Sequence, residues 1–355
     1  WTGAASGIWN TNAVNWLSGS GTPTSYIDGD FVRFDDSLSG TPLITLDRTV
    51  SPGGVTFSNA TKAYSLNGSG SIAGQVAMTK EGTNRLFINT TNTFSGPVII
   101  GGRVVINNHA ALGKGPKEIG IRSLLGMYAE LHLDGSAGPV ILPSDLSFST
   151  YGDSAFAGNI VNDAGHNVIN SYFNMVSGGG HTKFRVVQGS LTVNGIVNCS
   201  NGSSNKQLQL DGTGTNTING VIQDGTRKAL LGVFGGTWIL TGTNNYTGAT
   251  TVATNGTLVV EGSLANTPLT VQNGGALRGP GRIEGAVTVQ AGARIEPATS
   301  IDALTLGNSL TLQGTTIMKI SRTASGLSND RITGVTTNTY GGALVIMNVG
   351  THPLQ

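Results

Sequence analysis

One unit of sequence occurs twice in this chain of 355 residues. Residues 85–111 read RLFINTTNTFSGPVIIGGRVVINNHAA, and residues 237–265 read TWILTGTNNYTGATTVATNGTLVVEGSLA. Both copies are centred on Asn-x-aromatic-Ser/Thr-Gly, which pairs Asn92 with Asn244, Phe94 with Tyr246 and Gly96 with Gly248. A repeated unit of this size is the signature of a repeat architecture. We expect its Asn-x-aromatic centre to form a corner between coils and not a binding motif.

Strand-like triplets recur at nearly constant intervals in the last third of the chain. The first series lies at 250–252, 269–271, 287–289 and 304–306. A second series lies between its members, at 257–260, 276–278 and 293–295. Two interleaved series with one period predict stacked coils in which alternate side chains point inward. The sequence therefore predicts an all-β fold, a right-handed parallel β-helix, with roughly 16 coils of about 18 residues.

Composition supports short strands and excludes several classes of protein. The 54 glycines supply turns, and an apolar content of 38% excludes a disordered chain. A net charge of +1 without a basic cluster gives no electrostatic footprint for nucleic acid. One cysteine, Cys199, excludes an internal disulfide framework, and no apolar run approaches the ~18 residues of a membrane-spanning helix. Because the chain begins at Trp1 without a signal peptide, we expect a processed or truncated start.

Residues 1–60 differ from the rest because aromatic side chains gather there. They contain three of the four tryptophans, Trp1, Trp9 and Trp16, followed by Tyr26, Phe31 and Phe34. The first coil of a solenoid exposes an apolar cross-section and strand edges, so we predict an aromatic-rich N-terminal cap. The alternative is a platform of exposed tryptophans that stacks on carbohydrate. Residues 61–355 would then form the β-helix, with a loop insertion over the less regular residues 147–167.

The second repeat also carries a family resemblance. Residues 240–252, LTGTNNYTGATTV, resemble the autotransporter-associated β-strand repeat, also called the passenger-associated transport repeat, of secreted bacterial passenger domains. The run from Leu304 through Asn329-Asp-Arg-Ile-Thr-Gly to Gly341-Gly-Ala-Leu-Val-Ile looks like the segment that closes such passengers. The resemblance implies a rod-like extracellular β-helix from a bacterial surface or secreted protein. It implies no common enzymatic activity, so it supplies no catalytic residue and no cofactor.

Carboxylates are the residues to examine for catalysis, because a glycosidase needs two of them within about 5–10 Å. Asp134 and Asp211 both occur in Leu-Asp-Gly, but Asp-Gly commonly makes a tight turn, and we expect turns at both positions. A groove, if one exists, is expected beside the irregular stretch. The titratable residues there are Asp145, Asp153, Asp163, His166 and His181.

Metal sites have no clear signature in the sequence. The five histidines lack the spacing of zinc ligands. Asp28 and Asp30, with Asp35 and Asp36, offer oxygens that could bind Ca²⁺, but solvated turn carboxylates are the favoured interpretation. We expect no metal and no cofactor, and we interpret Cys199 as a small buried residue or an inert thiol.

These observations favour a structural protein over an enzyme. We expect an extracellular protein of a bacterial surface that assembles with its own copies into a fibre, sheath or layer through strand edges or flat faces. The alternative is an adhesin that binds glycans or host surface proteins through one face or through residues 147–167. A polysaccharide lyase or glycosidase is the third hypothesis. The expected partners are copies of the same chain, with a surface glycan as a further candidate.

Overall fold

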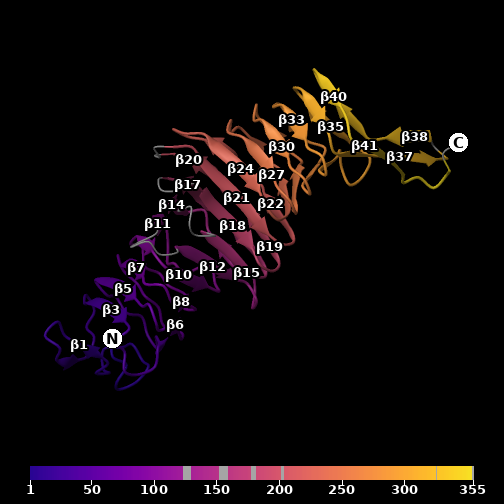
Figure 1. The fold of residues 1–355 in the computed structure, drawn as a ribbon. Helices are drawn as coiled ribbons and strands as arrows, with labels where there is room; N and C mark the ends of the chain where they lie inside the picture. The colour runs from indigo at the N-terminus through magenta and orange to yellow at the C-terminus, as the bar shows by residue number, and fades with distance from the viewer. Residues whose placement is uncertain (123–128, 152–158, 177–180, 201–203, 325, 354–355) are drawn as a thin grey trace. The chain divides into compact units, whose positions relative to one another are not determined.

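The computed structural model describes residues 1–122, 129–151, 159–176, 181–200, 204–324 and 326–353. All the regular structure in these residues is β-strand, and they contain no helix long and apolar enough to cross a membrane. The chain divides into two compact units, residues 1–190 and 191–355. Within each unit, short strands stack in parallel from coil to coil (Figure 1).

The first unit contains two long series of parallel strands. One series is β4 (Leu43–Thr45), β6 (Tyr64–Asn67), β8 (Arg85–Ile88), β10 (Arg103–Ile106), β12 (Glu130–Asp134), β15 (Ile160–Ala164) and β18 (His181–Val186). The other is β3 (Phe31–Asp35), β5 (Gly54–Ser58), β7 (Ala77–Glu81), β9 (Val98–Ile100), β11 (Lys117–Arg122), β14 (Leu146–Tyr151) and β17 (Tyr172–Met175). Two short pairs complete the unit, the antiparallel β1 (Trp16–Leu17) and β2 (Pro23–Thr24) and the parallel β13 (Ile141–Leu142) and β16 (His166–Ile169).

The second unit continues the same design with three main series. The first is β21 (Lys206–Gly212), β24 (Ala229–Val233), β27 (Thr250–Val252), β30 (Leu269–Val271), β33 (Val287–Val289), β36 (Leu310–Leu312) and β40 (Asn338–Tyr340). The second is β19 (Ser190–Val193), β22 (Thr215–Ile218), β25 (Gly236–Leu240), β28 (Gly256–Val260), β31 (Ala276–Arg278), β34 (Arg294–Glu296) and β37 (Thr315–Thr323), which pairs with both β38 (Gly326–Asn329) and β41 (Ala343–Asn348). The third is β26 (Thr243–Asn244), β29 (Ser263–Leu264), β32 (Arg282–Ile283), β35 (Ala303–Leu306) and β39 (Arg331–Thr333), and β20 (Val197–Cys199) pairs with β23 (Ile222–Asp224).

The predicted parallel β-solenoid is confirmed, and its core follows the apolar-Thr-apolar pattern. In β30, Leu269 and Val271 are buried while Thr270 points outward, and Leu269 stacks on Val287 of the next coil.

The expected number of coils is too high, because the structure has about 12 turns. The regular period of the last third of the chain holds only for some coils. Leu131 pairs with Val104 of the coil before it and with Ile160 of the coil after it. Both of these steps along the chain are longer than the step from Thr250 to its register partner Leu269. Longer coils account for the smaller number of turns.

The stretch 147–167, for which the sequence predicted a loop insertion, contains strand for most of its described length. It includes all but one residue of β14, the whole of β15 and the start of β16. Both β14 and β15 pair in parallel with the following strands β17 and β18. The coil stack therefore continues through these strands, and residues 152–158 lie outside the described residues.

The aromatic side chains near the N-terminus form the expected cluster, except for Phe31, which is 86% exposed. The rings of Trp1, Trp9, Trp16, Tyr26 and Phe34 are all buried, with neighbouring centroids 4.9–6.1 Å apart. Phe34 then stacks face to face on Phe57 of the following coil, 4.6 Å away. The alternative of a carbohydrate-stacking platform is wrong for these tryptophans, because burial removes their faces from solvent.

The repeated Asn of the two sequence copies joins three consecutive coils. The Asn244 side chain accepts the backbone N–H of Ile222 at 2.9 Å, and it donates to the carbonyl of Ser263 at 3.2 Å. Asn92 likewise accepts from Ile72 at 2.9 Å and donates to Ala111 at 2.8 Å. Both side chains are buried. The interpretation of this motif as a corner between coils is therefore confirmed.

Replacing Asn244 with Ala should lower the free energy of unfolding by about 2–3 kcal/mol, because the buried N–H of Ile222 loses its acceptor. Thermal denaturation followed by circular dichroism measures this change. The matched control is Asn266→Ala, at an exposed position, with an expected change within about 0.5 kcal/mol. Equal effects of the two substitutions would contradict the structural role of Asn244.

The repeated Gly offers a second test, because a Cβ atom at Gly248 would lie 2.2 Å from the carbonyl oxygen of Ala229. A Cβ atom at Gly96 would likewise lie 2.3 Å from the carbonyl oxygen of Val76. Gly248→Ala should therefore destabilise the fold by about 1–3 kcal/mol through overpacking. Gly19→Ala is the control, since no atom lies within 4 Å of its added Cβ atom. A Gly248→Ala protein as stable as this control would exclude close packing at the corner.

Candidate functional site

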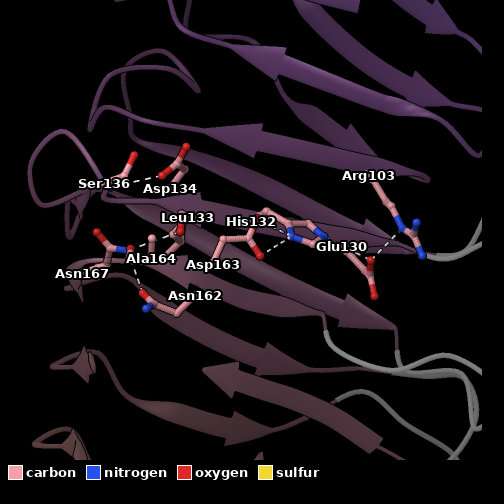
Figure 2. A network of polar contacts seen from close by, with 10 residues as sticks. All are labelled: Arg103, Glu130, His132, Leu133, Asp134, Ser136, Asn162, Asp163, Ala164 and Asn167. Atoms are coloured by element: carbon pink, nitrogen blue, oxygen red, sulfur yellow. Dashed lines mark hydrogen bonds and ion pairs between the residues drawn. The ribbon is translucent and has the colours of Figure 1, made fainter. Parts of the chain in front are cut away.

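A connected network of charged side chains crosses three neighbouring strands of the first unit (Figure 2). Arg103 begins β10, Glu130 and His132 lie on β12, and Asp163 lies on β15. Arg103 is the register partner of Glu130, so these two side chains leave adjacent coils at the same level. The strict alternation of Glu130, Leu131, His132 and Leu133 buries both leucines and sends the two polar side chains to the other face of the strand.

His132 lies between two carboxylates. Its Nδ1 is 3.0 Å from both side-chain oxygens of Asp163, and its Nε2 is 3.2 Å from Oε2 of Glu130. The same Glu130 oxygen accepts a hydrogen bond from Nε of Arg103 at 2.9 Å. The side chains of His132 and Glu130 are each 8% exposed, whereas those of Asp163 and Arg103 are 32% and 36% exposed. The centre of the network is therefore shielded from water, whereas Arg103 and Asp163 at its two ends are in contact with water.

A β-bulge brings Asp163 to His132. Leu133 pairs with Asn162, but the next residue, Asp134, pairs with Ala164, so β15 has one extra residue at Asp163. A bulge of this kind re-aims a side chain without ending the strand. Asn162 remains buried and donates to the carbonyl oxygens of Gly165 and Gln188.

The environment of His132 favours its charged form. Burial lowers the pKa of the imidazole, but the hydrogen bonds and negative charges of Asp163 and Glu130 outweigh this effect and raise the pKa above 6.5. The doubly protonated ring donates from both nitrogens, and so it satisfies both carboxylates at once. The network is then a chain of alternating positive and negative groups.

This arrangement joins coils and leaves little scope for other chemistry. The imidazole occupies the space between Glu130 and Asp163, where a glycosidase would need a substrate and a water molecule. An imidazolium has no free lone pair with which to bind a metal. Within the described residues, no group of three His, Cys, Asp or Glu side chains is arranged to hold a metal ion.

The structure separates most of the residues that the sequence singled out. Asp134 accepts the N–H of Ser136 at 3.1 Å, as expected for a turn. The turn expected at Asp211 is wrong, because Asp211 and Gly212 end strand β21, where Asp211 accepts the N–H of Gly212 at 2.8 Å. His166 is exposed and contacts Ser190 Oγ at 2.8 Å. No hydrogen bond or ion pair joins Asp145, Asp163 and His166 to one another in the described structure. His181 begins β18, and Asp153 lies outside the described residues.

Sequence reasoning found Asp163 but missed Arg103, Glu130 and His132. The alternating run ELHLD at residues 130–134 indicates that Glu130 and His132 share one face of a strand. That signal could have linked these two residues to each other. It could not have linked them to Asp163, because the bulge in β15 is not visible in the sequence.

The acidic residues near the N-terminus hold backbone amides. Asp36 accepts the N–H groups of Ala60, Thr61 and Lys62 at 2.8–3.1 Å. Burial raises the pKa of Asp36, but these backbone hydrogen bonds outweigh that effect and lower the pKa from 3.8 to about 2. Asp28 accepts from the N–H of Ser51 at 2.7 Å. Asp28 and Asp36 therefore join one coil to the next and are not simple turn carboxylates. The predicted turn contacts are made by Asp30, which accepts the N–H of Ile27 at 2.9 Å, and by Asp35, which accepts the N–H of Ser37 at 3.0 Å.

Among known proteins, the chain is similar to the adhesin BmaC autotransporter of Brucella suis biovar 1 (strain 1330). The two are 31% identical over 155 residues, which cover 37% of this chain and 4% of that protein. This chain therefore spans only a small part of the length of its relative. No family model matches the chain, and no solved structure matches it.

Asp36 provides a test of this contact between coils. Asp36→Ala should cost about 0.5–2 kcal/mol of stability at pH 7, because three backbone amides lose a charged acceptor and water only partly replaces it. The folded pKa lies below the unfolded value of 3.8, so this contribution is complete above pH 3.8 and is lost as the pH falls towards about 2. Thermal denaturation of both proteins between pH 2 and 7 measures it, with the exposed Glu118→Ala as control. A difference between wild type and Asp36→Ala that does not shrink in acid would contradict this account.

Proposed function

We propose that this chain is a β-solenoid segment of an autotransporter-like passenger, displayed on or secreted from a bacterial surface, with a structural, adhesin-like role. The observation that carries the proposal is the 31% identity to an autotransporter adhesin over 155 residues. The duplicated LTGTNNYTGATTV-type unit supports assignment to the passenger-associated repeat. Its buried Asn, aromatic and Gly positions all serve the stacking of coils, as a passenger rod requires.

We further propose that the segment has no catalytic activity. Its buried polar side chains are engaged in holding one coil to the next, as Asn244 and His132 illustrate. Of the carboxylates considered for catalysis, Asp134 and Asp211 accept backbone N–H groups, and Asp163 contacts a histidine. Such a scaffold suits display and contact better than the turnover of a substrate.

Assembly with identical copies is the finer part of the proposal, and we favour lateral contact over end-to-end stacking. The aromatic cluster at the N-terminal coil buries the apolar cross-section that end-to-end stacking would use. In the second unit, by contrast, one outer sheet face carries an uncharged row of threonines on five successive strands. The register partners in this row are Thr251, Thr270, Thr288, Thr311 and Thr339. Hydroxyl groups both donate and accept, so this row is complementary to an identical one.

Adhesion is the second candidate, because the relative is named an adhesin. In that case a face of the solenoid would bind a surface glycan or a host protein, and the monomer would be the active form. The two candidates differ in whether the purified chain assembles by itself.

Negative-stain microscopy and sedimentation of the purified chain test the proposal. We expect filaments, sheets or bundles that sediment, and we expect the double substitution Thr270→Lys and Thr288→Lys to abolish them by like-charge repulsion across the shared face. Thr257→Lys, on β28 of another sheet, is the matched control and should still assemble.

Three results would count against the proposal. Dispersed monomers over a range of pH and salt would contradict assembly, and glycan binding by those monomers would favour the adhesin. New reducing ends or unsaturated products from plant or algal polysaccharides would contradict the absence of catalysis.

A further inference from the structure

We infer that Arg103, Glu130, His132 and Asp163 form a pH-sensitive latch between the coils of β10, β12 and β15. The latch is closed when both ring nitrogens of His132 carry a proton and opens when one proton is lost. It concerns local opening of the solenoid and does not depend on the function proposed above.

The geometry around His132 requires both ring nitrogens to donate a hydrogen bond. Both nitrogens of His132 face carboxylate oxygens, at 3.0 Å and 3.2 Å. A neutral imidazole has only one N–H group, and its other nitrogen carries a lone pair. Whichever proton leaves, a lone pair then faces an anionic oxygen of Glu130 or Asp163. Loss of the Nδ1 proton breaks the link between β12 and β15, whereas loss of the Nε2 proton breaks the contact with Glu130 inside β12 and leaves that buried carboxylate with one cationic partner fewer.

The charges around the ring lead to the same result. Arg103 faces the network from β10, Glu130 lies on the same strand as His132, and Asp163 faces it from β15. With His132 charged, two positive and two negative groups balance. With His132 neutral, one negative charge is left in a site whose centre is 8% exposed, and desolvation makes that charge costly.

The flanking strands carry further positive charges at register positions beyond the network. Arg185 on β18 is the register partner of Val161, which in turn pairs with His132. Arg85 on β8 pairs with Arg103. Both arginines are exposed, so solvent screens their effect on the buried ring.

The direction of the pH effect follows from the raised pKa of His132. Because the folded pKa lies above 6.5, the stabilisation is complete below pH 6.5 and is lost as the pH rises through the folded value. The surrounding apolar contacts do not titrate, and Leu131, Leu133 and Ile160 stay in the core. Opening is therefore expected to be local to β12 and β15.

Two measurements on the intact chain test the latch. Carbon-13 labelling of the five histidines allows an NMR titration, in which His132 should titrate above pH 6.5. Hydrogen–deuterium exchange, corrected for the intrinsic effect of pH, should show protection of β12 and β15 falling across the same range. The expected fall is about tenfold for each pH unit by which the pKa of His132 exceeds 6.5.

Variants separate the latch from a merely structural histidine. His132→Gln should remove the pH dependence of protection, and His132→Lys should remove it while keeping a positive charge between the carboxylates. His166→Gln, at the exposed histidine beside Ser190, is the control and should retain the wild-type pH dependence. Titration of His132 at or below pH 6.5 would overturn the inference. So would an unchanged pH dependence in His132→Lys, a measurement that remains available if His132→Gln does not fold.

Discussion

This structure depends on one constraint: the backbone N–H groups that are buried where strands end must find hydrogen-bond acceptors. Along the strands, parallel pairing satisfies the amides, but at corners a buried N–H without a partner costs about 1–3 kcal/mol. Buried asparagine side chains accept such N–H groups, as Asn92, Asn167, Asn216 and Asn244 illustrate. Glycine has a related role, since Gly96 and Gly248 let one coil approach the carbonyl groups of the coil before it.

Oppositely charged residues at matching positions of adjacent coils also join those coils. Arg103 pairs in register with Glu130 in the first unit, and Arg278 pairs in register with Glu296 in the second. Each glutamate also contacts a buried basic side chain, His132 in one case and Lys319 in the other. Buried ion pairs contribute little net stability, but removing one partner is costly, so such pairs favour one register over others.

This use of polar groups bears on function. The buried polar side chains described above are engaged in joining coils, as His132 and Asn244 illustrate. The similarity to an autotransporter adhesin covers a small part of that protein, so it supports a role for the segment and not for the whole relative. A solenoid in which each coil contacts only its neighbours can be lengthened or shortened without losing its packing.

The sequence alone determined the parallel β-solenoid, the buried aromatic cluster and the corner formed by Asn92 and Asn244, because each of these is encoded in a local pattern. Only the tertiary structure decided the lengths of the coils and the partners of His132. The coils that contain β10, β12 and β15 are longer than those in the last third of the chain, so extrapolating the period of that last third predicted too many coils. The bulge at Asp163 changes which side chains face one another, and it arises from stacking between segments far apart in the chain.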